Sequence, residues 1–217
     1  MKWKLVVFDL DGTLINTIDD LGAAVNYALE SKGLPLHETE AYKKMVGGGV
    51  RNLVWKALPE QYKDDEAKLD ELLAVFMEYY SSHICVHSHP YPGVSQLLEQ
   101  LNAAGVRIAV ASNKIQEGTE MLVAKLFPLI EFVSVYGGRP GVPLKPDPSV
   151  IATILAEAGV APSEAVMVGD SGTDTRTAAA SGLSSIAVTW GFKPESAVVG
   201  ADYVADTDAQ LCSLLLD

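Results

Sequence analysis

From about residue 91 to the end of the chain, short apolar runs alternate with segments of helical spacing. Val94, Leu97, Leu98 and Leu101 recur at the interval of a helix in 94–104, which ends at Gly105. Further helices are expected at 119–127, 148–158, 173–181 and 209–216, and strands at 106–111, 132–135, 165–168, 185–189 and 202–204. Strands that alternate with helices predict a parallel sheet covered by helices on both faces.

The first part of the chain departs from this alternation. An apolar run at 5–8 is typical of a buried strand in such a sheet. The segment that follows has helical spacing at 19–32, 50–58 and 66–82, and no part of it has a convincing strand pattern. We therefore expect a Rossmann-like α/β core domain made of residues 1–15 and 89–217, with an α-helical cap domain, 16–88, inserted after the first strand. The two crossings would form a hinge.

Polar side chains gather where the expected strands end. The set holds four carboxylates, a hydroxyl, an amide and an ammonium: Asp9, Asp11, Ser112, Asn113, Lys145, Asp170 and Asp174. The carboxyl ends of parallel strands meet at one edge of the sheet, where open α/β proteins bind their ligands. Neighbouring carboxylates repel each other unless a counter-charge is present. The simplest interpretation is a bound cation and chemistry on an anionic substrate.

These groups suit phosphoryl transfer. A carboxylate oxygen can attack phosphorus, and a second acid can protonate the leaving oxygen and then activate water. Mg²⁺ prefers oxygen ligands and keeps several waters, so one or two carboxylates suffice to hold it. The cation and Lys145 can neutralise the phosphoryl oxygens, while Ser112 and nearby backbone N–H groups hold the rest.

The chain resembles the haloacid dehalogenase-like hydrolase superfamily, and within it the phosphoglycolate phosphatase-like enzymes. The family's four motifs occur in order: Asp9-Leu10-Asp11-Gly12-Thr13-Leu14, Ser112-Asn113, Lys145-Pro146-Asp147-Pro148, and Gly169-Asp170 with Asp174. The helical insert is similar to the α-helical cap of the family, so the resemblance covers nearly the whole chain.

This resemblance implies a role for each matched residue around Mg²⁺. Asp9 would be the nucleophile and a metal ligand. Asp11 would be the general acid and base, and its backbone carbonyl would bind the metal. Asp170 would complete the protein ligands. An acid at Asp11 favours phosphatase chemistry over that of the dehalogenase branch, which lacks one.

The resemblance also assigns the groups around the phosphate. Ser112 would bind the transferred phosphoryl group, with Asn113 beside it. Lys145 would balance the negative charge of the nucleophile and the phosphate. Asp174 would lie behind the metal ligands and orient Lys145 or a metal-bound water.

The cap is harder to interpret. The segment Gly47-Gly48-Gly49 is either a flexible connection between helices or a loop in which Gly48 and Arg51 close over the non-phosphate end of the substrate. At the hinge, Asn16-Thr17 stands where the family often has Asp-Ser or Asp-Thr. We expect activity to survive this change, which bears on hinge behaviour and substrate preference.

The implied activity is Mg²⁺-dependent hydrolysis of a small phosphomonoester through an aspartyl-phosphate, with 2-phosphoglycolate as the first candidate. A phosphosugar mutase, a pyrophosphatase or a nucleotidase could use the same scaffold. A signalling receiver also has clustered acids and a lysine around a phospho-aspartate, but such domains are smaller and have no helical cap.

Composition and net charge limit the kinds of partner that the protein is expected to bind. The 217 residues are 48% hydrophobic and 20% charged, which suits a globular domain with an insert. The net charge of −12 argues against nucleic acid or an anionic membrane surface as a partner, and no apolar run approaches the ~20 residues of a membrane helix. We expect a cytoplasmic enzyme, monomeric or homodimeric, that binds a small phosphorylated metabolite.

Two further groups of residues are interpreted as structural. Cys85 and Cys212 are far apart in sequence, and we expect both to be reduced. His83, His87 and His89 lie near Cys85, but their spacing matches no common zinc site, so surface histidines near the junction of cap and core are expected.

Overall fold

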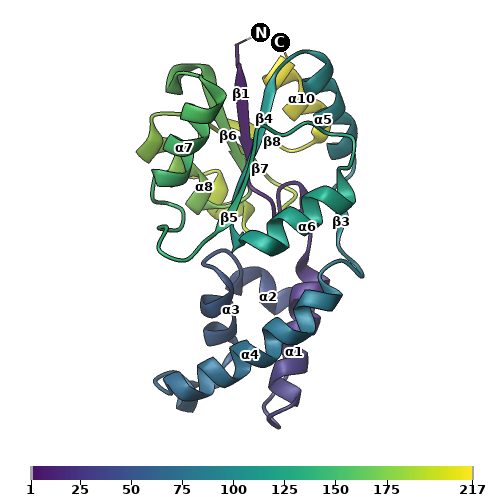
Figure 1. Ribbon diagram of the computed structural model, residues 1–217, viewed down its shortest axis with the longest axis vertical. Helices are drawn as coiled ribbons and strands as arrows, with labels where there is room; N and C mark the ends of the chain where they lie inside the picture. Colours follow the sequence, from purple (N-terminus) through teal and green to yellow (C-terminus); the bar gives the residue numbers. More distant parts are fainter. Residues whose placement is uncertain (1, 217) are drawn as a thin grey trace.

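A computed structural model describes residues 2–216 and confirms the expected α/β fold with a helical cap (Figure 1). Six parallel strands form the main sheet in the order β5-β4-β1-β6-β7-β8. Their bounds are Leu5–Phe8 (β1), Arg107–Ile115 (β4), Ser134–Gly138 (β5), Ala165–Gly169 (β6), Ser184–Val188 (β7) and Tyr203–Ala205 (β8). The chain adds β4 and β5 on one side of β1 and the later strands on the other. The order therefore reverses at β1, and such a switch point opens a crevice at the carboxyl ends of the strands.

Helices cover both faces of this sheet (Figure 1). On one face lie α7 (Ser149–Ala158) and α8 (Gly172–Ser181), and on the other lie α5 (Val94–Ala103), α6 (Gln116–Leu126) and α10 (Asp208–Leu216). A one-turn helix, α9 (Pro194–Ala197), follows β7. Within β1, Val6 and Phe8 pack against the second set of helices, whereas Leu5 and Val7 pack against the first. Because both faces are covered, all four side chains are fully buried, and each contributes roughly 1.5–3 kcal/mol to stability.

The cap stands beyond the carboxyl edge of the sheet, and both chain termini lie at the opposite end of the molecule (Figure 1). Its helices are α1 (Ile18–Glu30), α2 (Thr39–Met45), α3 (Val50–Ala57) and α4 (Glu66–His83), with a 3₁₀ turn at Glu60–Tyr62. Helix α2 was not predicted from the sequence. This helix has seven residues and buries only Tyr42, so it has no apolar periodicity to detect.

The two crossings between cap and core run side by side. Residues Ile15–Asn16 (β2) and His89–Pro90 (β3) form a two-stranded antiparallel ribbon, with Ile15 opposite Pro90. The ribbon was not predicted, because strands of two residues have no alternation to recognise. It lies at the expected hinge, while the cap limits of 16 and 88 remain a prediction.

Two boundaries in the core differ from expectation. The strand expected at 106–111 continues as β4 to Ile115, so Ser112 and Asn113 lie inside the strand instead of after it. The apolar run stops at Ala111, but the backbone stays extended, and the pairing with β5 shifts register between Ala111 and Ile115. The strand expected at 132–135 is β5, which begins two residues later. From residue 2 to residue 216, no helix combines the length and the apolar character that a membrane crossing requires.

Candidate active site

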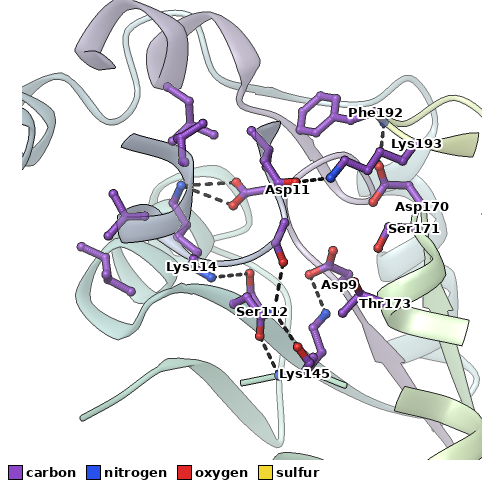
Figure 2. Close-up of a pocket in the computed structure, with 18 of the residues that line it drawn as sticks. Asp9, Asp11, Ser112, Lys114, Lys145, Asp170, Ser171, Thr173, Phe192 and Lys193 are labelled. Carbon is purple, nitrogen blue, oxygen red and sulfur yellow. Dashed lines mark hydrogen bonds and ion pairs between the residues drawn. The ribbon is translucent and has the colours of Figure 1, made fainter. Parts of the chain in front are cut away.

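A pocket of about 730 Å³, counted to its open mouth, lies between the carboxyl edge of the sheet and the cap (Figure 2). The core contributes all seven polar residues expected at the strand ends: Asp9, Asp11, Ser112, Asn113, Lys145, Asp170 and Asp174. The cap contributes a largely apolar wall that includes Leu53, Phe76 and Tyr80. The convergence expected from parallel topology is therefore present.

Three carboxylates meet at the base of the pocket. Asp9 follows β1, Asp170 follows β6, and Asp174 lies in the first turn of α8. One oxygen from each of them lies within 4.8 Å of the other two. Asp174 is fixed by its helix, because its carboxylate accepts the backbone N–H of Ser171 at 3.1 Å and the Ser171 hydroxyl at 2.7 Å.

A buried lysine lies against this triad. The Lys145 Nζ is 2.9 Å from Asp9 Oδ1 and 2.7 Å from Asp174 Oδ1. The Asn113 side chain holds the backbone of Lys145 in place: its Oδ1 accepts the Lys145 N–H at 2.8 Å, and its Nδ2 donates to the Lys145 carbonyl at 3.0 Å. Asn113 thus positions the lysine.

The charges of this cluster leave room for a cation. Burial raises the pKa of Asp9 to about 8, although Lys145 opposes the rise. Burial also raises the pKa of Asp170 to about 7, with Asp174 adding to it and the Phe192 N–H, 2.6 Å away, opposing it. Three buried carboxylates face one ammonium, so the site lacks positive charge. An all-oxygen donor set of this charge fits a divalent metal ion.

Asp11 has a separate environment. Its Oδ1 accepts the Thr17 hydroxyl at 2.7 Å and lies 3.3 Å from the Lys114 Nζ. The same ammonium donates to the Tyr80 hydroxyl of α4 at 2.6 Å. Asp11 is therefore held by one residue of the hinge and, through Lys114, by one residue of the cap. The Asp11 side chain does not belong to the carboxylate triad, which consists of Asp9, Asp170 and Asp174.

The match to a sequence family decides what kind of protein carries this site. The family model described as haloacid dehalogenase-like hydrolase matches residues 6–188. The chain belongs to the haloacid dehalogenase-like hydrolases. This agrees with the resemblance seen in its four motifs.

Several relatives of this hydrolase are phosphoglycolate phosphatases. The phosphoglycolate phosphatase of Mesorhizobium japonicum is 34% identical over 193 residues, which cover 88% of this chain and 85% of the relative. That of Chromobacterium violaceum is 33% identical over 214 residues, covering 98% and 96%. Among solved structures, a predicted phosphoglycolate phosphatase from Haemophilus somnus superposes with a TM-score of 0.90 at 27% identity, covering 99% of this chain and 98% of the other.

Two cap residues that were expected to contact the substrate lie outside the lining of the pocket. The Arg51 guanidinium is exposed and forms ion pairs with Glu66 and Asp70 of α4, outside the pocket lining. Gly48 is also outside the lining, while its neighbours Gly47 and Gly49 contribute to it. The start of α3 directs Arg51 towards the acidic beginning of α4, so the expected substrate contact has no support in this structure.

Two lysines of the pocket were missed by the sequence analysis. Lys114 follows the matched pair Ser112-Asn113, and Lys193 follows β7; both line the pocket. The only sequence signal for Lys114 is its position directly after a motif. Within residues 2–216, the acidic triad is the one group of three or more possible metal ligands, and the histidines near Cys85 form none.

Two glycines allow the loops to meet at Asp170. Gly12 has a φ of +89°, which disfavours other residues, and a Cβ there would collide with the Asp170 carboxylate. A Cβ on Gly191 would collide with the Asp170 side chain and with the carbonyl of Gly12. Glycine at both positions lets the chain close around this carboxylate.

Proposed function

We propose that this hydrolase is a Mg²⁺-dependent phosphatase of small phosphomonoesters, with 2-phosphoglycolate as the first candidate substrate. The observation that carries the proposal is the buried cluster of Asp9, Lys145, Asp170 and Asp174, with Asp11 held separately beside it. The names of the relatives support the choice of substrate.

We propose Asp9, Asp170 and the backbone carbonyl of Asp11 as the metal ligands, with Asp174 next to them. The donor atoms are all oxygens, which favours Mg²⁺ over metals that prefer nitrogen or sulfur. When bound, the ion would supply positive charge to the nucleophile and to the phosphoryl oxygens.

In the first half of the proposed reaction, a carboxylate oxygen of Asp9 attacks phosphorus and the ester bond breaks. Asp11 donates its proton to the leaving oxygen, so the alcohol departs neutral. In the second half, Asp11 takes a proton from water as the water oxygen attacks the phosphorus of the aspartyl-phosphate. The bond to Asp9 breaks, and inorganic phosphate is released.

The remaining polar groups would hold the phosphoryl oxygens. Lys145 touches Asp9 and is placed to offset charge on the transferred group. The Ser112 hydroxyl oxygen accepts the backbone N–H of Lys114 at 3.2 Å, which leaves its own proton free to donate to a phosphoryl oxygen.

The cap would shield this chemistry from water. Leu53 and Phe76 are buried apolar residues that line the pocket opposite the carboxylates. We assign residues 16–88 to the cap and the ribbon of β2 and β3 to its hinge. We also place the enzyme in the cytoplasm, where its two free thiols, Cys85 and Cys212, would stay reduced.

The test is the Asp9→Asn variant, which keeps the size of the side chain and removes its nucleophilic charge. Phosphate release from 2-phosphoglycolate should fall by at least ~10³-fold with Mg²⁺ present, because no covalent intermediate can form. Asp64→Asn, an exposed acid of the cap, is the matched control and should retain activity. Hydrolysis of phosphomonoesters at the normal rate by Asp9→Asn would refute the assignment.

A further inference from the structure

One ammonium in the pocket has no carboxylate partner in the described structure. Of the three lysines that line it, Lys145 pairs with Asp9 and Asp174, and Lys114 pairs with Asp11. Lys193 donates only to the backbone carbonyl of Val46 in the cap. Figure 2 shows Lys114 and Lys193 approaching the pocket from opposite sides.

The core holds Lys193 in a defined position relative to the acidic triad. The N–H of the preceding residue, Phe192, donates to Asp170 Oδ2 at 2.6 Å. From this anchor the Lys193 side chain extends to the cap, where its Nζ lies 3.4 Å from the place of a Cβ on Gly47. Lys193 therefore spans the distance between the proposed phosphate site and the cap loop that faces it.

The surroundings of this ammonium favour an anion. Lys193 is half-buried, and burial lowers its pKa, with the nearby Lys56 lowering it further. The charges of Asp170 and Asp174, which lie beyond ion-pair distance, oppose this fall only in part. A neutral carbonyl offsets only part of the cost of removing a charge from water. On the side of the cap, the pocket lining includes the apolar side chains of Val46, Val50 and Leu53, which offer no charge. An anionic group of a ligand would be its strongest partner.

We propose that Lys193 binds a carboxylate of the substrate, at the end remote from the phosphoryl group, and so selects phosphorylated carboxylic acids over uncharged phosphomonoesters. This inference rests on the proposed phosphatase function. It assigns the recognition of the remote end to the core segment after β7, instead of to Arg51 of the cap, whose guanidinium is occupied by Glu66 and Asp70.

The test compares two substrates that differ in one group. Ethyl phosphate has a methyl group where 2-phosphoglycolate has its carboxylate. In Lys193→Met, the loss in kcat/KM should be about 10- to 100-fold larger for 2-phosphoglycolate than for ethyl phosphate, chiefly through KM, since a charge-assisted hydrogen bond is removed. Lys193→Arg should restore most of the preference.

Lys56→Met is the matched control. Its ammonium donates to the carbonyl of Met45 at 3.2 Å, next to Val46, but Lys56 does not line the pocket. This variant should keep the preference for 2-phosphoglycolate. An equal loss on both substrates in Lys193→Met would show that Lys193 only holds the cap loop, and would overturn the proposal, as would an unchanged preference.

A binding experiment separates this inference from the proposed function. Calorimetry with Mg²⁺ present would compare 3-phosphonopropionate, which has a carboxylate, with propylphosphonate, which has none; neither can be hydrolysed as an ester. The unaltered protein should bind the first about 10-fold or more tightly, and Lys193→Met should remove the difference. Equal binding by the unaltered protein refutes the role of Lys193. Failure to release phosphate from any phosphomonoester refutes the catalytic assignment instead.

Discussion

A buried carboxylate next to the hinge provides a quantitative test of how the two ends of the cap are held together. Asp20, in the first turn of α1, is only 2% exposed. It accepts the backbone N–H groups of Val86, His87 and Ser88 at 2.8–3.1 Å, and the Ser88 hydroxyl at 2.7 Å. One side chain thus fixes the end of the cap, just before the chain returns to the core.

The cost of Asp20→Ala follows from what each donor can do without the carboxylate. Val86 and His87 are exposed, so water can replace the lost acceptor at their N–H groups. Ser88 is buried, and its hydroxyl can still donate to the Ile84 carbonyl at 3.2 Å, but its N–H has no other partner in the described structure. A buried donor without a partner costs about 1–3 kcal/mol, and the lost charge-assisted bonds add to it. We expect a total loss of ~2–4 kcal/mol.

Urea unfolding followed by circular dichroism would measure this loss, with a fall in Tm of roughly 5–15 °C as a second readout. Asp19→Ala is the control, because Asp19 is exposed and lies in the same first turn. Both variants lose the interaction with the helix dipole, about 0.3–1 kcal/mol. The difference between them therefore reports the hydrogen bonds of Asp20. Equal and small effects in the two variants would refute the proposed clamp.

Three further predictions concern the site. Gly191→Ala should lower both kcat and Tm, because the new Cβ collides with Asp170 and with the backbone of Gly12; unchanged kinetics would contradict the close approach. Lys114→Met should lower kcat by about 10- to 100-fold in steady-state assays, because it releases Asp11, and a general acid contributes about 10²–10⁴. Removal of metal with a chelator should abolish phosphate release, and added Mg²⁺ should restore the activity. The reason is that Lys145 alone offsets the negative charge of the carboxylate triad. Full activity after chelation would exclude a metal.

The fold was largely predictable because its strands are covered on both faces. A strand such as β1 must then be apolar at every position, and a short continuous run is easy to recognise. The elements that were missed include α2, α9 and the ribbon of β2 and β3, which are all short. Their residues have no periodic pattern, so a single sequence contains little local information about them.

The site was predictable where topology alone brings residues together. The ends of β1, β4 and β6 must converge in a parallel sheet, and the polar residues there did so. Lys193 could not be identified, because a lysine after a strand has the same pattern whether it faces water or a pocket. Its position depends on contacts with Asp170 and Val46, which are distant in sequence. The partners of Arg51 could not be identified from the sequence for the same reason, since the acids that pair with it lie on another helix, α4.

The proposed mechanism depends on Asp9 carrying the phosphoryl group between substrate and water. Rapid acid quench of the enzyme during turnover of 2-phosphoglycolate, followed by peptide mass spectrometry, tests it most directly. We predict a phosphate on Asp9 in the unaltered protein that disappears when substrate is exhausted, and none in Asp9→Asn. Phosphate found on another residue, or turnover by Asp9→Asn at the normal rate, would refute this role of Asp9.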